Sequence, residues 1–350
     1  MAYTTINKST LHYNTKLYTG TGSSLALTGV GFQPDIVWIK ARSNTEDHCI
    51  YDAVRGGSKR ISPNQNTSTW DSATNISSFD SDGFTVSTNS QINTNGATHI
   101  AYNWKANGAG SANTDGDINS TVSANTTAGI SVVKWTGNGS NDQRIGHGLG
   151  VRPVTWWIKR LTSNDDWIVY HQGLATNWYD DTYLYLNSSS EVMGAVNAGT
   201  GNPTTSVFYV GDDGRTNGNG QDYIAYVFAE TQGFSKFNYY KGNGSTNGPF
   251  IFTGFKPAYF MIKRKGVASH FTLFNNKRPN EFNEITACFE ANTNAVEQDN
   301  TGYNDVDFLS NGVKIREDNG DINADGGHYV YWAWAEAPIV GTNNIPCTAR

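Results

Sequence analysis

Short runs of alternating hydrophobic and polar residues recur along this chain, and three of the runs are close copies of one another. The copies read GFQPDIVWIK, GVRPVTWWIK and GFKPAYFMIK, and they start at Gly31, Gly150 and Gly254. Alternating runs rich in aromatic and β-branched residues predict β-strands, and no segment sustains the apolar period of a helix. The chain is therefore expected to be one β-rich module used three times.

Further landmarks accompany each copy. An aromatic-x-G-[TN]-G-S turn precedes it, starting at Tyr18, Trp135 and Tyr240. A closing strand ends each module, reading HIAYNWKA from His99, DYIAYVFAE from Asp222 and HYVYWAWAE from His328, with Tyr102, Tyr226 and Trp332 in one shared position. The strand that ends in Ile-Lys, at Lys40, Lys159 and Lys263, is expected to reach solvent there, with the lysine ammonium in water.

We predict an all-β fold of three tandem β-sandwich modules, jelly-roll-like or lectin-like, with little helix. The modules are expected at 1–106, 130–231 and 232–340. Between the first two, 107–129 is rich in Gly, Asn, Ser and Thr and is predicted to be a flexible or extended linker. Modules two and three, which have no linker, should form a rigid pair, and the first could sit at another angle. A polar tail, 341–350, follows.

Composition narrows the classes of function. The net charge is −6, with 16% charged and 13% aromatic residues, and no basic patch that would suggest nucleic-acid binding. The cysteines, Cys49, Cys288 and Cys347, lack the spacing of a disulfide framework or zinc site. No signal-peptide core and no long apolar run occur, so synthesis in a cytoplasm without membrane insertion is expected.

The phrases GFQPDIVWIK, SFDSDGFTV, NTDGDINSTVSANTTAG and YVYWAWAEAP, together with the stretch from Gly233 to Arg264, carry a resemblance. From about Tyr3 to Arg350 the chain resembles a repeat of structural, tail-fibre-like proteins of tailed bacteriophages, especially marine ones. The resemblance implies a protein of the virion surface, made in the host cytoplasm. It brings no catalytic motif with it.

Residues able to do chemistry differ among the three copies. One slot holds Asp52, His171 and Asn275, and the slot before the closing strand is assigned to His99, Asp222 and His328. The carboxylates that a glycan-cleaving tailspike would need are Asp47, Asp52, Asp80, Asp82, Asp165, Asp166, Asp180 and Asp181. Cys49 follows His48 in a strand, so the two side chains point to opposite faces and cannot pair as nucleophile and base. We therefore expect no enzyme.

Metal binding is weakly indicated. The run Asp321-x-Asn323-x-Asp325-Gly matches the first half of an EF-hand loop, but it lacks the closing glutamate and flanking helices. A plain Asn/Asp/Gly turn is favoured over a Ca²⁺ loop, and no other cofactor is expected.

Aromatic residues are the remaining candidates for contacts with ligands or partners. Trp70, Trp178 and Tyr179 lie in loop-like regions outside the repeated landmarks, where they could stack on sugars. Trp156 and Trp157 are adjacent in a strand, so one should face the module core and the other an interface.

Three functions are consistent with these observations. The first is a structural protein of the particle surface: a capsid decoration, head-fibre or fibre-like protein bound to other virion proteins and to copies of itself. The second is a receptor-binding adhesin of the tail fibre that recognises host surface glycans through weak sites multiplied by copy number. The third is a polysaccharide-degrading tailspike.

Overall fold

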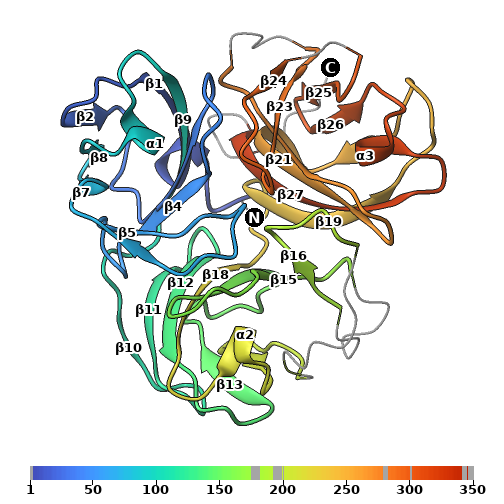
Figure 1. Cartoon of the computed structure of the whole chain (residues 1–350). Coiled ribbons are helices and arrows are strands. Elements are labelled where there is room, and N and C mark those ends of the chain that lie inside the picture. Colours follow the sequence, from blue (N-terminus) through green and yellow to red (C-terminus); the bar gives the residue numbers. More distant parts are fainter. Residues whose placement is uncertain are drawn as a thin grey trace.

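The computed structural model describes residues 3–174, 182–191, 199, 201–278, 283–299, 302–340 and 345, and over this part of the chain the protein is all-β. This confirms the all-β class that the sequence predicts. Each third of the chain builds a larger and a smaller antiparallel sheet. The three thirds lie around a common centre (Figure 1).

In the first module the larger sheet has the order β1-β9-β3-β4, and the smaller sheet has the order β2-β8-β7. A two-stranded ladder, β5-β6, stands beside them. The elements are the 3-10 helix η1 Ser9–Leu11, β1 Tyr13–Thr19, β2 Leu25–Thr28, β3 Ile36–Ala41, β4 Cys49–Asp52, β5 Lys59–Arg60, β6 Trp70–Asp71, β7 Ile76–Asp80, β8 Gly83–Val86, α1 Ser90–Asn93 and β9 Thr98–Trp104.

The second module has a larger sheet of order β10-β11-β12-β18-β14-β15-β16 and the pair β13-β17. Its elements are β10 Ser111–Asn113, β11 Ser120–Asn125, β12 Ile130–Thr136, β13 Gln143–Gly146, β14 Thr155–Arg160, β15 Ile168–His171, β16 Leu184–Tyr185, β17 Val207–Val210, α2 Gly214–Asn217 and β18 Asp222–Phe228.

The third module repeats the arrangement with the orders β19-β27-β21-β22-β23-β24 and β20-β26-β25. Its elements are β19 Ser235–Lys241, β20 Phe250–Phe252, β21 Phe255–Lys265, β22 Phe271–Asn275, β23 Ala287–Glu290, β24 Gln298–Asp299, β25 Val306–Leu309, β26 Gly312–Ile315, α3 Gly320–Asn323 and β27 His328–Pro338.

The segment expected to be a linker, 107–129, instead supplies two strands to the second module. β11 pairs with β12 along its whole length, and Val122 packs into the core of that module. Ile118 also joins that core and bridges to Ile145 on β13. Two widely spaced apolar residues are enough to hold a strand whose backbone is paired, but they are too few to be visible in a Ser/Thr/Asn-rich composition.

An aromatic cluster at the centre joins all three modules. Trp104 of the first module and Phe228 of the second both contact Trp334 of the third, with ring centroids 5.3 and 5.2 Å apart. Trp38 and Trp157 meet edge to face at 5.8 Å. The first module therefore packs against both of the others, and the freedom of orientation that we expected for it is absent from this arrangement.

The repeated strand-ending lysines do not reach solvent as expected. Lys40, Lys159 and Lys263 are all fully buried. Lys159 donates to the carbonyls of Asp165 and of Asn66, the latter in the first module. Burial lowers the pKa of each of the three lysines to about 8. A neighbouring module covers the strand end that would face water in an isolated β-sandwich. Backbone carbonyls therefore replace water as hydrogen-bond partners of the buried ammonium groups.

Lys263 and Lys40 follow the same pattern at the other two junctions. Lys263 donates to the carbonyls of Ser269 and, at 3.3 Å, of Ser189 in the second module. The Lys40 ammonium lies 5.7 Å from the ring centroid of Phe289 in the third module. Lys159 thus contacts the first module, Lys263 the second and Lys40 the third. The repeated strand pattern did not indicate these contacts.

Candidate functional site

The three variable polar positions of the repeat lie at the junctions between modules. At the first junction, the buried Asp52 carboxylate accepts a hydrogen bond from Arg55 at 2.6 Å. It also accepts one at 2.8 Å from the hydroxyl of Tyr226, which belongs to the second module. Both charges are buried, but each is paired and hydrogen-bonded, as a stable buried ion pair requires.

At the second junction, His171 lies against the ring of Trp332 in the third module, with centroids 4.6 Å apart. Its Nδ1 accepts from the Gly173 backbone N–H at 3.0 Å, so the neutral ring donates from Nε2 to the Tyr331 carbonyl at 3.1 Å. Burial lowers the pKa of His171 to about 3. This histidine is therefore a neutral part of the interface rather than a proton carrier.

At the third junction, the Asn275 amide donates to the Tyr102 hydroxyl of the first module at 3.2 Å. Arg278 reaches the same hydroxyl at 3.4 Å. Each module thus uses the same position to contact the closing strand of the next, from first to second, second to third and third back to first. The modules form a closed ring with pseudo-threefold symmetry, which we call the module ring.

From the sequence, His99, Asp222 and His328 are expected to be equivalent positions before the closing strand. This equivalence is wrong by one residue in the second and third modules. The ladders pair Tyr18 with His99, Trp135 with Tyr223, and Tyr240 with Tyr329. In each pair the rings stack, with centroids 5.0, 5.3 and 4.9 Å apart. The strand register, which the sequence alone could not determine, places a stacked ring at this position in every module. The position therefore does not hold residues of differing chemistry.

Trp156 and Trp157 occupy opposite faces of β14. Trp156 stacks on Tyr170, with centroids 4.0 Å apart, inside the core of the second module. Trp157 belongs to the central cluster, where it contacts Trp38 of the first module and Trp332 of the third. The interface candidate is therefore Trp157, and the interface is one within the chain.

Of the three loop aromatics, only Trp70 lies among the described residues; Trp178 and Tyr179 lie outside them. Trp70 is 52% exposed. The Arg60 guanidinium stacks 4.3 Å from its ring centroid, as a cation–π pair across the β5-β6 ladder. One face of this tryptophan is therefore occupied by the protein itself.

The residues considered for enzyme chemistry have structural contacts. His48 is buried, accepts from the Trp38 indole at 2.9 Å, and packs against Phe289 of the third module. Cys49 faces the core of the first module, and burial raises the pKa of its thiol to about 12. The two side chains point apart, as the strand geometry requires.

Apart from Asp52, the candidate carboxylates that the structure describes accept hydrogen bonds from groups of their own modules. Asp82, for example, accepts from the backbone N–H groups of Gly29 and Gly31 at 2.9 and 2.6 Å. The others placed by the structure in this way are Asp47, Asp80, Asp165 and Asp166. Asp180 and Asp181 lie outside the described residues.

The Ca²⁺ candidate is the third copy of a turn found in every module. Asn93, Asn217 and Asn323 each end a one-turn helix and are fully buried. The Asn323 amide donates to Ser245 and Glu317 carbonyls, and its oxygen accepts from the Asn243 backbone N–H. That oxygen is therefore already engaged. Among the described residues, no group of three His, Cys, Asp or Glu could hold a metal ion.

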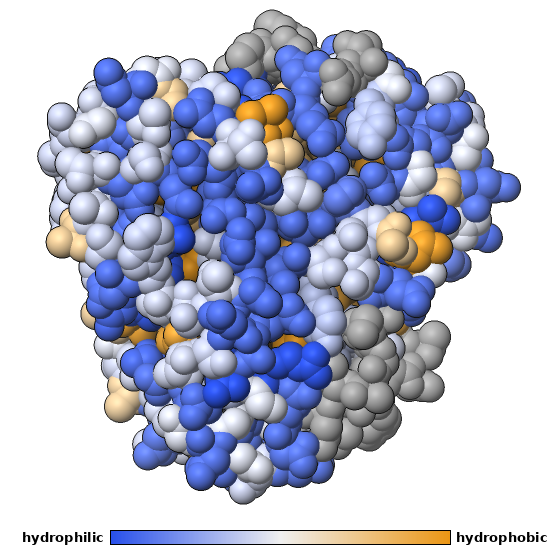
Figure 2. Space-filling view, viewed as in Figure 1, coloured by the Kyte–Doolittle hydropathy of each residue, from blue (hydrophilic) through white to orange (hydrophobic). Residues whose placement is uncertain are grey.

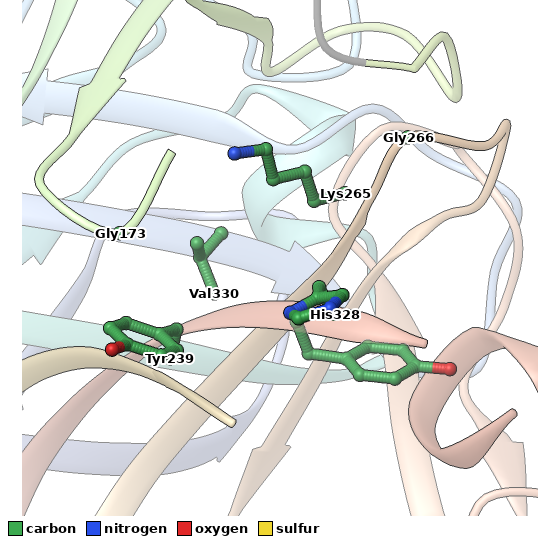
Figure 3. A pocket seen from close by; sticks show the side chains of 7 residues that line it. Gly173, Tyr239, Lys265, Gly266, His328 and Val330 are labelled. Atoms are coloured by element: carbon green, nitrogen blue, oxygen red, sulfur yellow. The ribbon is translucent and has the colours of Figure 1, made fainter. Parts of the chain in front are cut away.

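A cavity that sequence analysis did not predict opens between the second and third modules. Its volume is about 600 Å³, and it is lined by Gly173, Tyr239, Lys265, Gly266, His328, Tyr329 and Val330 (Figure 3). Tyr239 is 63% exposed although it lies in the middle of a strand. The signal for this site was present in the sequence as an extra tyrosine beside Tyr240, but its orientation depends on the strand register.

The face shown in Figure 2 is mostly hydrophilic, with small, separated hydrophobic areas. Among the described residues there is no helix of the length and hydropathy needed to cross a bilayer.

Comparison with known proteins identifies the family of this chain. None of the curated proteins or solved structures matches it. A family model described as a domain of unknown function, DUF7483, matches residues 8–338. The matched range runs from before β1 to the end of β27, so it takes in all three modules of the ring as one unit. The chain belongs to the DUF7483 family.

Proposed function

We propose that this protein is a non-enzymatic structural component of the surface of a bacteriophage particle: a capsid decoration, head-fibre or fibre-like protein. Two lines support the proposal. The chain resembles virion proteins of tailed phages, and its repeated residues serve packing. The observation that carries it is the module ring, in which Asp52, His171 and Asn275 each contact the following module.

A ring closed by buried contacts suits a structural role. Each module is held by both neighbours, so its outer loops keep fixed positions relative to one another without an external scaffold. The work of such a protein is shape-complementary binding, in which buried area and fit at the interface provide specificity. Its partners would be other virion proteins and further copies of itself, on a particle assembled in the host cytoplasm.

The proposal requires no cofactor. A Ca²⁺ ion at the third-module turn would have to share the Asn323 oxygen with the Asn243 N–H, from which that oxygen already accepts a hydrogen bond. Titration calorimetry of the intact chain with CaCl₂ is therefore expected to give no binding heat, and a site with micromolar affinity would contradict this.

Localisation on the particle tests the proposal directly. Purified phage heads lacking tails, and separately purified tails, would be probed with an antibody against the intact chain and imaged by immunogold electron microscopy. The expected result is regular labelling at a fixed copy number on one of the two structures. A protein found only in the lysate, and on neither heads nor tails, would refute the assignment to the virion.

Adhesion to host surface glycans is the second candidate, and exposed aromatic side chains favour it. Trp70 and Tyr239 are 52% and 63% exposed, respectively. Exposed aromatic rings with an apolar face and polar surroundings are enriched where proteins bind ligands. Binding of the purified chain to a host envelope glycan array would support adhesion, and no binding on multivalent display would count against it.

A further inference from the structure

The strand register of the third module brings three basic side chains into one row. Lys241 on β19 and Lys265 on β21 both lie directly opposite His328 on the central strand β27. All three residues lie on the same face of the sheet, because paired residues in neighbouring strands share a face. Lys241 and His328 are exposed, and Lys265 is half-buried.

The next row on the same face of the sheet contributes one exposed aromatic side chain, Tyr239. Tyr239 lies opposite Val330, two residues along from Lys241 and His328. Figure 3 shows the Tyr239 ring, the Val330 side chain and the His328 ring bordering the cavity, with Lys265 above them. A large, exposed aromatic ring therefore stands beside the Lys265 ammonium and the His328 imidazole, in a space of about 600 Å³. This volume is in the range of small-molecule sites, about 300–1,000 Å³.

The other two modules provide internal controls, because the same row exists in each. In the first module it is Thr19, Thr98 and Arg42, and in the second it is Thr136, Asp222 and Leu161. Neither row carries more than one basic residue. The basic row thus belongs to the third module alone, although the fold that displays it is common to all three.

In the first and second modules the residues equivalent to Lys265 are Arg42 and Leu161, and each is covered by a neighbouring module. The Thr69 N–H of the first module donates to the Leu161 carbonyl at 3.1 Å, and the Glu297 N–H of the third donates to the Arg42 carbonyl at 3.0 Å. The Arg42 guanidinium is further neutralised by the Glu297 carboxylate at 2.8 Å. At the junction of the second and third modules, the equivalent residue, Lys265, donates to the Leu174 carbonyl of the second module and, within the described part of the chain, lines the cavity.

We propose that this cavity binds an acidic saccharide, a sugar ring bearing a carboxylate. The exposed Tyr239 ring would stack on the apolar face of the sugar, while the Lys265 ammonium would pair with the carboxylate and His328 would offer a ring nitrogen. Lys241 stands in the same row of the sheet, next to this lining. Lys265 already donates one hydrogen bond to the Leu174 carbonyl, which positions its ammonium and leaves further N–H donors for a ligand. This inference deepens the second candidate function, adhesion, and does not depend on where the protein sits on a particle.

Calorimetry on the intact chain tests the proposal with tetragalacturonate as the acidic probe and maltotetraose as the neutral one. The acidic probe is expected to bind at least about tenfold more tightly, and more weakly as salt is raised, since the attraction to the basic row is screened. Y239A should weaken binding of the acidic probe about tenfold because the stacking surface is lost. F252A removes an exposed aromatic from β20, outside the cavity, and should leave binding unchanged.

Each alternative result is decisive. No heat with tetragalacturonate, or equal binding of the two sugars, would overturn the acidic-saccharide assignment. Equal losses in Y239A and F252A would overturn the location of the site. A tetraglutamate peptide that bound as tightly as tetragalacturonate would show an anion site with no saccharide preference. Particle localisation is measured separately, so failure here leaves the virion assignment standing and failure there leaves this site standing.

Discussion

The adjacent tryptophans of β14 allow the module ring to be tested with a matched pair of variants. W157A removes a side chain that contacts Trp38 of the first module and Trp332 of the third. W156A removes the same side chain from the core of the second module, where it stacks on Tyr170. The two residues are 2% and 4% exposed, so the variants remove nearly equal buried surfaces.

The expected loss of stability is similar for both variants, but its location differs. A buried tryptophan removes about 150–250 Å² from water, which at about 25 cal/mol per Å² corresponds to about 4–6 kcal/mol. Large-to-small core substitutions of this kind are measured at about 3–5 kcal/mol. In W157A this loss falls on the coupling between modules, whereas in W156A it falls on the second module alone.

Native-state hydrogen exchange can locate the loss. The Thr69 and Glu297 amides donate to Leu161 and Arg42 across two junctions, at 3.1 and 3.0 Å. Weakening the junctions by about 3–5 kcal/mol should speed exchange of these two amides about hundredfold to thousandfold in W157A. In W156A the faster exchange should appear within the second module, with Glu297 still protected. Equal loss of protection at Glu297 in both variants would refute the module ring as the unit of stability.

Three further predictions follow from the buried polar contacts. Y226F removes the hydroxyl donor to the buried Asp52 carboxylate and should lower the free energy of unfolding in urea by about 1.5–3 kcal/mol. Y18F, which loses a hydrogen bond to the Ile92 carbonyl within one module, should lower it by only about 0.5–1.5 kcal/mol. Equal costs would argue against the buried ion pair. Because burial lowers the pKa of His171 from 6.5 to about 3, the unfolded chain binds more protons, so stability should fall as pH drops below about 6.5. H171Q should flatten that acid dependence, and an unchanged slope would contradict it. Lowering the pKa of Lys159 from 10.5 to about 8 should make stability rise between about pH 8 and 10, and K159M should reduce the rise; a wild-type stability that falls across that window would contradict the assignment.

Much of the fold could be predicted because strand patterns are local. The alternation around Trp156 and Trp157 placed the two rings on opposite faces, as β14 has them. The Gly-containing turns and the closing strands were also recognisable, since positive-φ glycines such as Gly139 and Gly244 leave a clear mark in sequence. The strands of 107–129 were missed because pairing, rather than apolar content, holds them in the sheet.

The candidate cavity could not be predicted, because it depends on register between strands far apart in the chain. Lys241, Lys265 and His328 become neighbours only when β19 and β21 pair with β27. The same limit displaced the slot before the closing strand by one residue, which placed Asp222 where Tyr223 stands.

Local residue patterns were enough to predict an all-β protein, one strand pattern in three copies, and two apolar faces on each central strand. Which face packs in the module's own core, and which meets another module, depends on how the three modules pack together. The reason is physical: a period of two residues separates the faces of a strand but does not say what covers them. Lys40, Lys159 and Lys263 look like solvent-facing strand ends in isolation, and the ring buries all three.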